Sequence, residues 1–292
     1  MKYARIERQR DTWPMEWMCE ALGVSASGFT AWKRGGNCSK RLTDAQLLAL
    51  IKSIHAETRG AYGAPRIWEE LKARGIPAGK ERIRKLMQAN GIRARHKRRY
   101  KATTDSKHSF PVAPNVLNRQ FRTVRPDQVW VADITYLPTA EGWLYLAAVM
   151  DLHTRMIVGW AMDSRMTRDL VINGLRMARF RRKPKAGLIH HSDRGSQYAS
   201  HDYQAVLKEY DMTPSMSRKG NCWDNAPMES FFNSLKNERT HHQRYATREE
   251  ARRDTFEYIE VFYNRSRRHS ALGYQSPAAF HAAWLNQQKL AA

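Results

Sequence analysis

The sequence predicts an α/β domain built on a mixed β-sheet, preceded by a basic helical region. Three strand-like stretches lie close together between residues 127 and 163, and after them helical and strand-like segments alternate. The third observation is charge: residues 1–126 hold 27 basic and 10 acidic side chains, within a chain whose net charge is +22. The length of 292 residues suits one large domain or two smaller ones.

Composition excludes several classes of protein. With 42% hydrophobic and 10% aromatic residues, the chain can bury a core and is not wholly disordered. The longest purely apolar run, residues 143–150, is far shorter than the roughly 18 residues that cross a bilayer. The N-terminus lacks the apolar stretch of a signal peptide, so we expect a cytoplasmic protein without a membrane partner. Cys19, Cys38 and Cys222 have no CxxC spacing and are expected to be reduced thiols.

The basic excess of the first 126 residues predicts a polyanionic partner. A concentrated positive field attracts nucleic acid, and release of condensed counterions drives the binding. An anionic membrane is the alternative. Gly and Pro interrupt the basic segments, which therefore make no single amphipathic surface helix. DNA or RNA is the favoured partner.

The helical region contains two candidate helix-turn-helix units. Residues 14–34 read as two short helices around a Gly-Val-Ser turn, and Ser25 or Ser27 is expected to cap the second helix. We assign this first helix-turn-helix-like segment to residues 1–40. Residues 44–57, 65–74 and 80–90 read as three more helices in a domain over 41–100. The exposed face of the last helix would carry Lys80, Arg84, Lys85 and Gln88. These side chains can reach phosphates and base edges, although a solvated face of a small helical bundle is the alternative.

A dense basic arm follows the last of these helices. It contains Arg93, Arg95, Lys97, Arg98, Arg99 and Lys101. Like charges at this density resist folding alone and suit contacts with phosphates. Residues 101–126 are rich in Ser, Thr, Asn and Pro without periodicity and are predicted to be a linker.

The α/β domain is predicted over residues 127–245. Residues 127–138 and 142–162 read as three strands in an antiparallel meander, whose aromatic residues, including Trp143, are expected in the core. The segments that follow are a helix at 167–182, a strand at 186–193, a helix at 201–210 and a strand at 212–217. This order implies a mixed sheet of five strands with flanking helices, as in the ribonuclease H type of fold. Helices at 247–263 and 277–285 would form a C-terminal extension over 246–292.

Three carboxylates are the candidate site. Asp133 lies inside an apolar strand, where an isolated charge is too costly to bury unless it is paired, neutral or bound to a cation. Asp193 ends the strand LIHHSD, and the carboxyl ends of strands are where α/β sheets place their ligands. Glu229 borders the apolar stripe of a helix that begins near Pro227. Three such carboxylates repel one another, and oxygen ligands favour Mg²⁺ or Mn²⁺.

Two neighbouring histidines, His190 and His191, suggest a zinc site only weakly. Adjacent strand residues point to opposite faces of a sheet, and the chain has no HxxxH or CxxC partner for them. Arg194 and Lys236 are candidate DNA contacts near the carboxylates. Asp151 is expected to be a turn residue that binds its own backbone, instead of a fourth ligand.

The blocks WVADITYL, HSDRGSQYAS and DNAPMESFFNSLKNE resemble those of the DDE transposase and retroviral integrase core. Asp193 and Glu229 are separated by 35 residues, the interval after which the D,D,35,E class is named, and Lys236 follows seven residues after Glu229 as in that family. The segments YGAPRIWEELKARG and YNRSRRHSALGYQSPAAF extend the likeness over nearly the whole chain. Together they resemble the OrfB-type transposases of the insertion-sequence-three family.

The resemblance implies an integrase catalytic core with Asp133, Asp193 and Glu229 as catalytic and metal-binding residues. It implies two Mg²⁺ or Mn²⁺ ions, cleavage that frees a 3′-OH, and joining of that 3′-OH to another phosphodiester through a circular intermediate. The implied partners are the terminal inverted repeats of the element, target DNA, a second copy of the chain, and the upstream-frame protein OrfA. The alternatives are a ribonuclease H-like nuclease that cuts without joining and a non-catalytic DNA-binding regulator.

Overall fold

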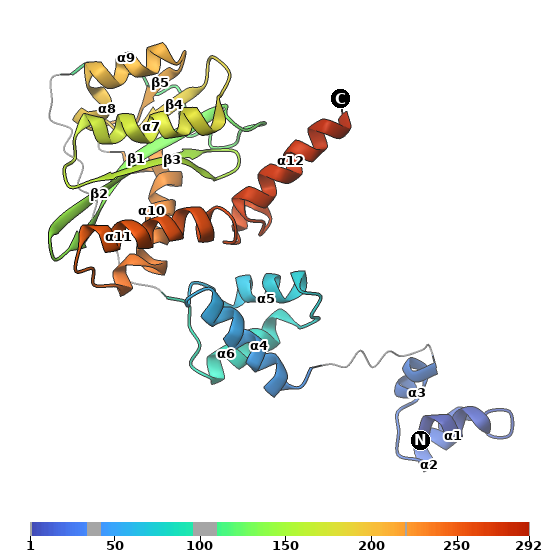
Figure 1. The fold of residues 1–292 in the computed structure, drawn as a ribbon. Helices are drawn as coiled ribbons and strands as arrows, with labels where there is room; N and C mark the ends of the chain where they lie inside the picture. Colours follow the sequence, from blue (N-terminus) through green and yellow to red (C-terminus); the bar gives the residue numbers. More distant parts are fainter. Residues whose placement is uncertain (1, 34–41, 96–109, 220, 292) are drawn as a thin grey trace.

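The computed structural model describes residues 2–33, 42–95, 110–219 and 221–291 (Figure 1). These ranges contain two small helical units and an α/β domain. None of the described helices is long and apolar enough to cross a membrane.

The first helical unit contains α1 (Lys2–Arg8), α2 (Met15–Ala21) and α3 (Ala26–Lys33). Its small core consists of Ile6, Cys19 and Phe29. The Ser25 hydroxyl accepts a hydrogen bond from Gly28 N at 3.1 Å, as expected of a residue that caps α3.

The second helical unit contains α4 (Asp44–Glu57), α5 (Ala64–Ala73) and α6 (Lys80–Ala89). Thr43 and Gln46 form a reciprocal capping box at the start of α4. One face of α6 places Ile83 and Met87 in the core that α4 and α5 complete. The predicted helical, helix-turn-helix-like region is confirmed.

The α/β domain contains a five-stranded sheet in the order β3-β2-β1-β4-β5. The strands are β1 (Val129–Thr139), β2 (Gly142–Asp151), β3 (Ile157–Asp163), β4 (Ile189–Ser192) and β5 (Thr213–Met216). β1, β2 and β3 form an antiparallel meander, whereas β4 pairs in parallel with both β1 and β5. The predicted mixed sheet is confirmed, with β1 at its centre.

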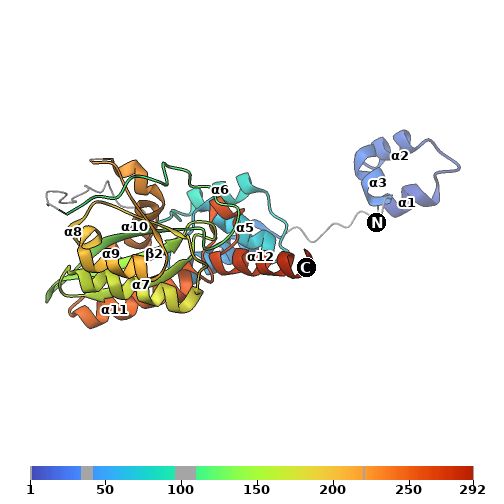
Figure 2. The ribbon, with the colours of Figure 1, turned by 90° about the horizontal axis from the view of Figure 1, so that it is seen from above.

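Helices cover both faces of this sheet (Figure 2). α7 (Arg168–Arg182), α8 (Ser196–Ala199) and α9 (His201–Glu209) share a core with Trp130 and Ala132 of β1. α10 (Ala226–Glu238) packs on the opposite face against Val129 and Val131. Alternate residues of β1 therefore belong to two different cores.

The C-terminal residues extend the domain. α11 (Arg248–Phe256) continues into a π-helical stretch, Glu257–Tyr263, and α12 (Pro277–Ala291) projects from the domain (Figure 1). Short 3₁₀ turns lie at Cys222–Asn225, Thr240–His242 and Ser270–Leu272. α12 runs six residues beyond the predicted end at residue 285, because nothing in NQQKLA interrupts a helix.

Two local expectations differ from the structure. Residues 110–126, expected to be linker, pack on the α/β domain: Leu117 is buried, and Val116 N and Leu117 N donate to the Ser215 hydroxyl. Trp143, expected in the core, is 49% exposed and meets Tyr136 edge to face at the start of β2. In the first case a contact with β5 decides burial, and in the second the position near the end of the sheet does; residue type alone reveals neither.

Candidate active site

Strand β1 directs Asp133 toward α10. Val129 and Val131 lie in the core that α10 completes, and Asp133 follows them on the same face of the strand. Its Oδ1 accepts a hydrogen bond from Ile134 N at 2.8 Å, and the side chain is half-buried. The carboxylate therefore interrupts a buried face of the strand, which continues at Leu137.

Strand β4 places Asp193 beside Asp133. Val131 pairs with His191 in the parallel register, and each aspartate lies two residues beyond its member of that pair. Residues two apart on a strand share a face, so both carboxylates lie on the side of α10. Gly195 N donates to Asp193 Oδ1 at 2.9 Å and holds the carboxylate at the turn after the strand.

Glu229 lies on the first turn of α10. Asn225 Nδ2 donates to the carbonyl oxygen of Ala132 at 3.1 Å and so ties the start of α10 to β1, one residue before Asp133. Pro227 occupies the first turn, where a missing N–H costs no helical hydrogen bond. Met228 and Phe231 then bury the apolar stripe against the sheet. Glu229 remains half-buried at the rim of that contact.

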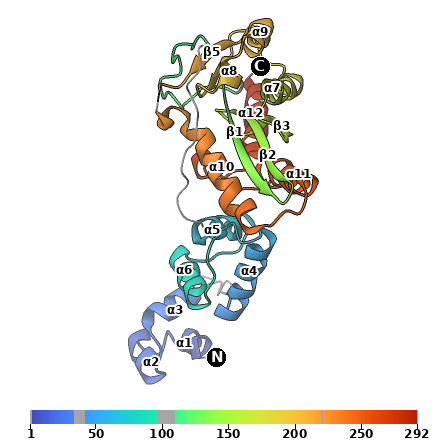
Figure 3. The ribbon, with the colours of Figure 1, turned by 90° about the vertical axis from the view of Figure 1, so that its left-hand side faces the viewer.

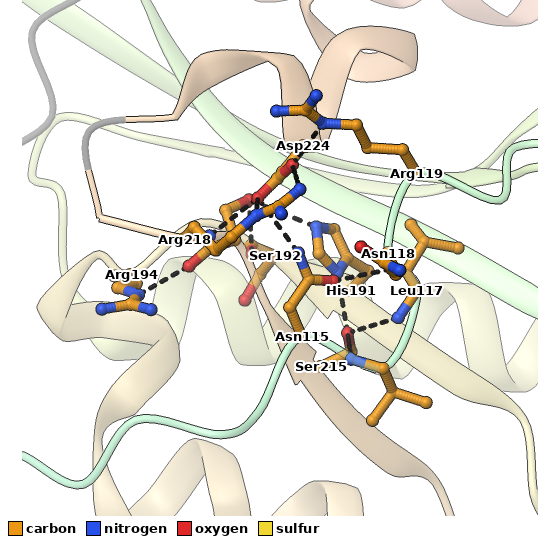
Figure 4. A network of polar contacts seen from close by, with 12 residues as sticks. Asn115, Leu117, Asn118, Arg119, His191, Ser192, Arg194, Ser215, Arg218 and Asp224 are labelled. Carbon is orange, nitrogen blue, oxygen red and sulfur yellow. Dashed lines mark hydrogen bonds and ion pairs between the residues drawn. The ribbon is translucent and has the colours of Figure 1, made fainter.

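An ion network around one buried carboxylate, Asp224, holds the loop before α10 (Figure 4). Asp224 is fully buried and accepts hydrogen bonds from Arg218 Nη2 at 2.8 Å, Arg119 Nε at 2.7 Å and Asn115 Nδ2 at 3.0 Å. These contacts hold the pKa of Asp224 far below its usual value, Arg218 contributing most. Asp224 is not among the residues predicted from the sequence, although it is a second carboxylate in the block DNAPME, five residues before Glu229.

The three predicted carboxylates interact electrostatically. Burial raises the pKa of Asp133 well above its usual value, and the negative charges of Asp193 and then Glu229 raise it further. Burial also raises the pKa of Glu229. Burial lowers the pKa of Lys236 to about 8, while the charge of Asp133 opposes that change. Burial and mutual repulsion therefore disfavour the charged forms of these carboxylates at the junction of β1, β4 and α10.

A divalent cation would relieve this repulsion. The donors are all oxygen atoms, which suit Mg²⁺ or Mn²⁺, and the Tyr198 hydroxyl and Asn225 Oδ1 are buried without a hydrogen-bond partner. Within residues 2–33, 42–95, 110–219 and 221–291, no three His, Cys, Asp or Glu side chains already form a closed metal-binding group. Metal binding by Asp133, Asp193 and Glu229 stays a prediction, supported by donor type and repulsion.

The two histidines and Asp151, considered above as possible metal ligands, make hydrogen bonds within the fold. His190 Nε2 lies 3.0 Å from the Tyr203 hydroxyl, and His191 Nδ1 lies 2.9 Å from the Ser215 hydroxyl. Asp151 accepts hydrogen bonds from Thr154 N and from Asp127 N, so it is a turn residue as expected.

The two buried histidines predict a pH-dependent stability. Burial lowers the pKa of His190 to about 3 and that of His191 to about 4, below the value of about 6.5 in an unfolded chain. As the pH falls below about 6.5, the unfolded chain gains protons that the folded chain does not accept. We expect the free energy of unfolding to fall by about 2 kcal/mol for each histidine between pH 8 and 5.

Urea unfolding at several pH values checks this expectation. His190→Gln and His191→Gln should each flatten the dependence on pH, even where the substitution itself lowers stability. His201→Gln, at an exposed position, is the matched control. A double variant with the same slope as the parent chain would contradict the assignment.

The predicted DNA-binding residues divide into three sets. Lys80, Arg84, Lys85 and Gln88 all lie on the exposed face of α6, and Arg93 follows them at the surface. Arg84 also pairs with Glu81 of the same helix at 2.6 Å, and Arg95 N donates to Gly60 O at 2.8 Å. Lys97, Arg98 and Arg99 lie outside the described residues.

The other two candidates lie beside the carboxylates. Arg194 Nε donates to Ser217 O at 2.6 Å. Lys236 is 7% exposed, and its ammonium group lies 5.0 Å from the centre of the Tyr136 ring. Their roles in DNA binding stay predictions.

Comparisons with known proteins place two kinds of domain on the chain. Models described as "Integrase core domain" match residues 123–222 and 210–277, and a model described as "HTH-like domain" matches residues 42–100. The matched ranges agree with the α/β domain and with the second helical unit. The match of the core from residue 123 is consistent with the packing of residues 110–126 on that domain.

Relatives match almost the full length of the chain. The "Transposase InsF for insertion sequence IS3A" of Escherichia coli (strain K12) is 42% identical over 96% of this chain and 98% of its own. The "Insertion element IS600 uncharacterized 31 kDa protein" of Shigella sonnei is 50% identical over 90% of this chain and 97% of its own. Among solved structures, the trimeric form of the HTLV-2 integrase catalytic core domain with magnesium has a TM-score of 0.43 and 13% identity, over 55% of this chain and 99% of that chain.

Proposed function

The chain belongs to the IS3 family of transposases, and from this premise we propose that it binds the ends of its own element and cleaves and joins DNA there with the help of divalent metal ions. The integrase-type core makes it an enzyme of the polynucleotidyl transferase class. The single observation that carries the proposal is the arrangement of β1, β4 and α10: Val131 pairs with His191 two residues before each aspartate, and Asn225 binds Ala132 O close to Glu229 in the chain.

In this proposal the three carboxylates hold the ions and orient the scissile phosphodiester between β1, β4 and α10. The chemistry supplied by two bound Mg²⁺ or Mn²⁺ ions is activation of the attacking oxygen and stabilisation of the leaving oxygen. Asp133 must be ionised to serve as a ligand, although its surroundings favour the neutral form in the free chain. Attack by water on a phosphodiester breaks its P–O3′ bond and frees a 3′-OH. Attack by that 3′-OH on a second phosphodiester forms a new P–O3′ bond and releases the former 3′-oxygen of that strand as a hydroxyl.

DNA binding is assigned to the second helical unit and the basic arm. The exposed face of α6 carries Lys80, Lys85 and Gln88, which suit contacts in a major groove. Two element ends must be held together for joining, so the proposal includes at least a dimer on DNA. The experiment is to add magnesium and a terminal-repeat duplex to the purified chain and to separate cut strands from joined strands.

The outcome separates the proposal from its alternatives. A preformed 3′-OH oligonucleotide that is never joined, although the duplex is cut, would favour a nuclease. Binding without any metal-dependent cut would favour a regulator. Joining that starts only after addition of the upstream-frame protein OrfA would identify that protein as a required partner.

The basic arm gives a prediction about salt. Arg98→Ala with Arg99→Ala should lower the slope of log affinity against log salt by about 2, because each lost phosphate contact removes about 0.9. The measurement is the affinity for the duplex at several KCl concentrations between about 50 and 300 mM. Lys185→Ala with Lys208→Ala removes the same charge from exposed positions of the α/β domain and is the matched control. Equal slopes for the two double variants would refute the contact.

A further inference from the structure

The segment Tyr263–His269 joins three parts of the molecule. Asn264 Oδ1 accepts a hydrogen bond from Ile157 N at 2.9 Å, and its Nδ2 donates to Ile157 O at 3.0 Å. These two bonds fix the segment to the first residue of β3. Tyr263 meets Phe231 of α10 edge to face, with ring centres 4.8 Å apart. The segment is therefore anchored on the sheet and on the helix that carries Glu229.

Arg267 binds the far end of that helix. Its guanidinium donates to the two oxygens of Glu238 at 2.7 and 2.6 Å, and both side chains are almost fully buried. The Tyr258 hydroxyl donates to the same carboxylate at 2.8 Å. A buried, bidentate pair of this kind is directional, so it fixes the orientation of α10 relative to the segment.

Arg268, the next residue, reaches into the helical unit. Its Nε donates to Glu70 of α5 at 2.7 Å, and Arg66 of α5 donates to its carbonyl oxygen at 3.1 Å. The Tyr62 hydroxyl donates to Ser266 O at 3.2 Å and accepts from Arg268 N at 2.8 Å. Arg66 also reaches Glu238 at 3.4 Å, so α5 touches the end of α10 directly (Figure 3).

The contact between the two domains is mainly polar. A cavity of about 370 Å³ lies between them, and its lining includes Arg59, Arg74 and Glu257. Phe262, the residue before the segment, packs against the helical core. Because apolar packing is limited here, directional ion pairs and hydrogen bonds set the angle between the domains.

We propose that Tyr263–His269 is a positioning junction that fixes the DNA-binding helical unit at a set distance from the three carboxylates. Arg267 holds α10 and Arg268 holds α5, so adjacent residues connect the helix that carries Glu229 to the unit that carries α6. These are positioning residues, because none of them touches the reacting atoms. The inference rests on the proposed function for its catalytic consequence, whereas the junction itself can be tested without catalysis.

Reversing the charges of the Arg268–Glu70 ion pair, which links the α/β domain to α5, tests the junction. Arg268→Glu or Glu70→Arg should each raise amide hydrogen exchange of α5 about tenfold, while β1 exchanges as in the parent chain. The double variant Glu70→Arg with Arg268→Glu restores opposite charges and should restore protection. Protection unchanged by either single reversal, or not recovered in the double variant, would overturn the junction whatever the chain does to DNA.

The same variants test the catalytic consequence. Each single reversal should lower cleavage of a bound element end about 100-fold, because displacement of the DNA by about 1 Å costs this much. Affinity for the terminal-repeat duplex should stay within about twofold, since the DNA-binding face of α6 is intact. The double variant should recover cleavage.

Arg181→Glu is the matched control, because it changes charge by the same amount but breaks only the pair with Glu260 inside the α/β domain. It should preserve both the protection of α5 and end cleavage. If the parent chain itself does not cut the duplex, the proposed function fails, while the exchange experiment still decides the junction. Recovery of exchange protection without recovery of cleavage in the double variant would overturn the positioning role.

Discussion

Asp133→Asn, Asp193→Asn and Glu229→Gln should each lower strand cleavage and joining by at least about 10³-fold, since metal-bound oxygens supply several kcal/mol of transition-state stabilisation. Each amide keeps the size of the side chain but removes the charge that holds a divalent ion. Affinity for a terminal-repeat duplex should survive, because the second helical unit and the basic arm, to which end binding is assigned, carry none of the three carboxylates. A labelled element end, followed through cutting and joining, gives the measurement.

Stability provides an independent readout of the same substitution. The raised pKa of Asp133 means that its charged form destabilises the metal-free fold at neutral pH. Asp133→Asn should therefore raise the unfolding temperature without metal, whereas added Mg²⁺ should stabilise only the parent chain. Asp169→Asn, at an exposed position in the first turn of α7, is the matched control and should change neither property. Full turnover by all three amide variants would defeat the assignment.

Sequence patterns predicted the fold where the burial of one apolar face determines the local structure. The alternation of Val129, Val131 and Asp133 identified a strand with a carboxylate on an otherwise apolar face, and the structure places α10 on that face. The Pro227 start and the apolar spacing of Met228 and Phe231 likewise indicated the helix with its buried side. Local pattern and tertiary packing agree at these positions, so reading the pattern is sufficient.

Patterns failed where burial depends on distant partners. Residues 110–126 have no periodicity, yet Leu117 is buried because Ser215, almost a hundred residues later, binds its backbone. Trp143 has the composition of a core residue but lies near the end of the sheet. The role of Arg267 and Arg268 depends on partners 29 and 198 residues away in the chain. No local signal in the sequence reports such distances.

Asp224→Ala should slow strand cleavage about 100-fold, because misplacement of a catalytic group by about 1 Å has an effect of this size. The carboxylate accepts hydrogen bonds from Asn115, Arg119 and Arg218, and the residue after it ties α10 to β1 next to Asp133. Its loss frees the loop that sets the position of Glu229. Asp224 is therefore a positioning residue, and sequence reasoning could have considered it only as a second carboxylate in its block.

Stability and turnover together distinguish positioning from unfolding. The free energy of unfolding should fall by about 2 to 3 kcal/mol, since the released arginines are partly exposed and regain contact with water. Turnover is measured well below the unfolding temperature, at saturating Mg²⁺ and duplex. Asp224→Asn keeps one acceptor oxygen and should show an intermediate loss in both quantities, whereas Asp169→Ala is the surface control. Turnover by Asp224→Ala within about twofold of the parent rate would show that the loop does not position Glu229.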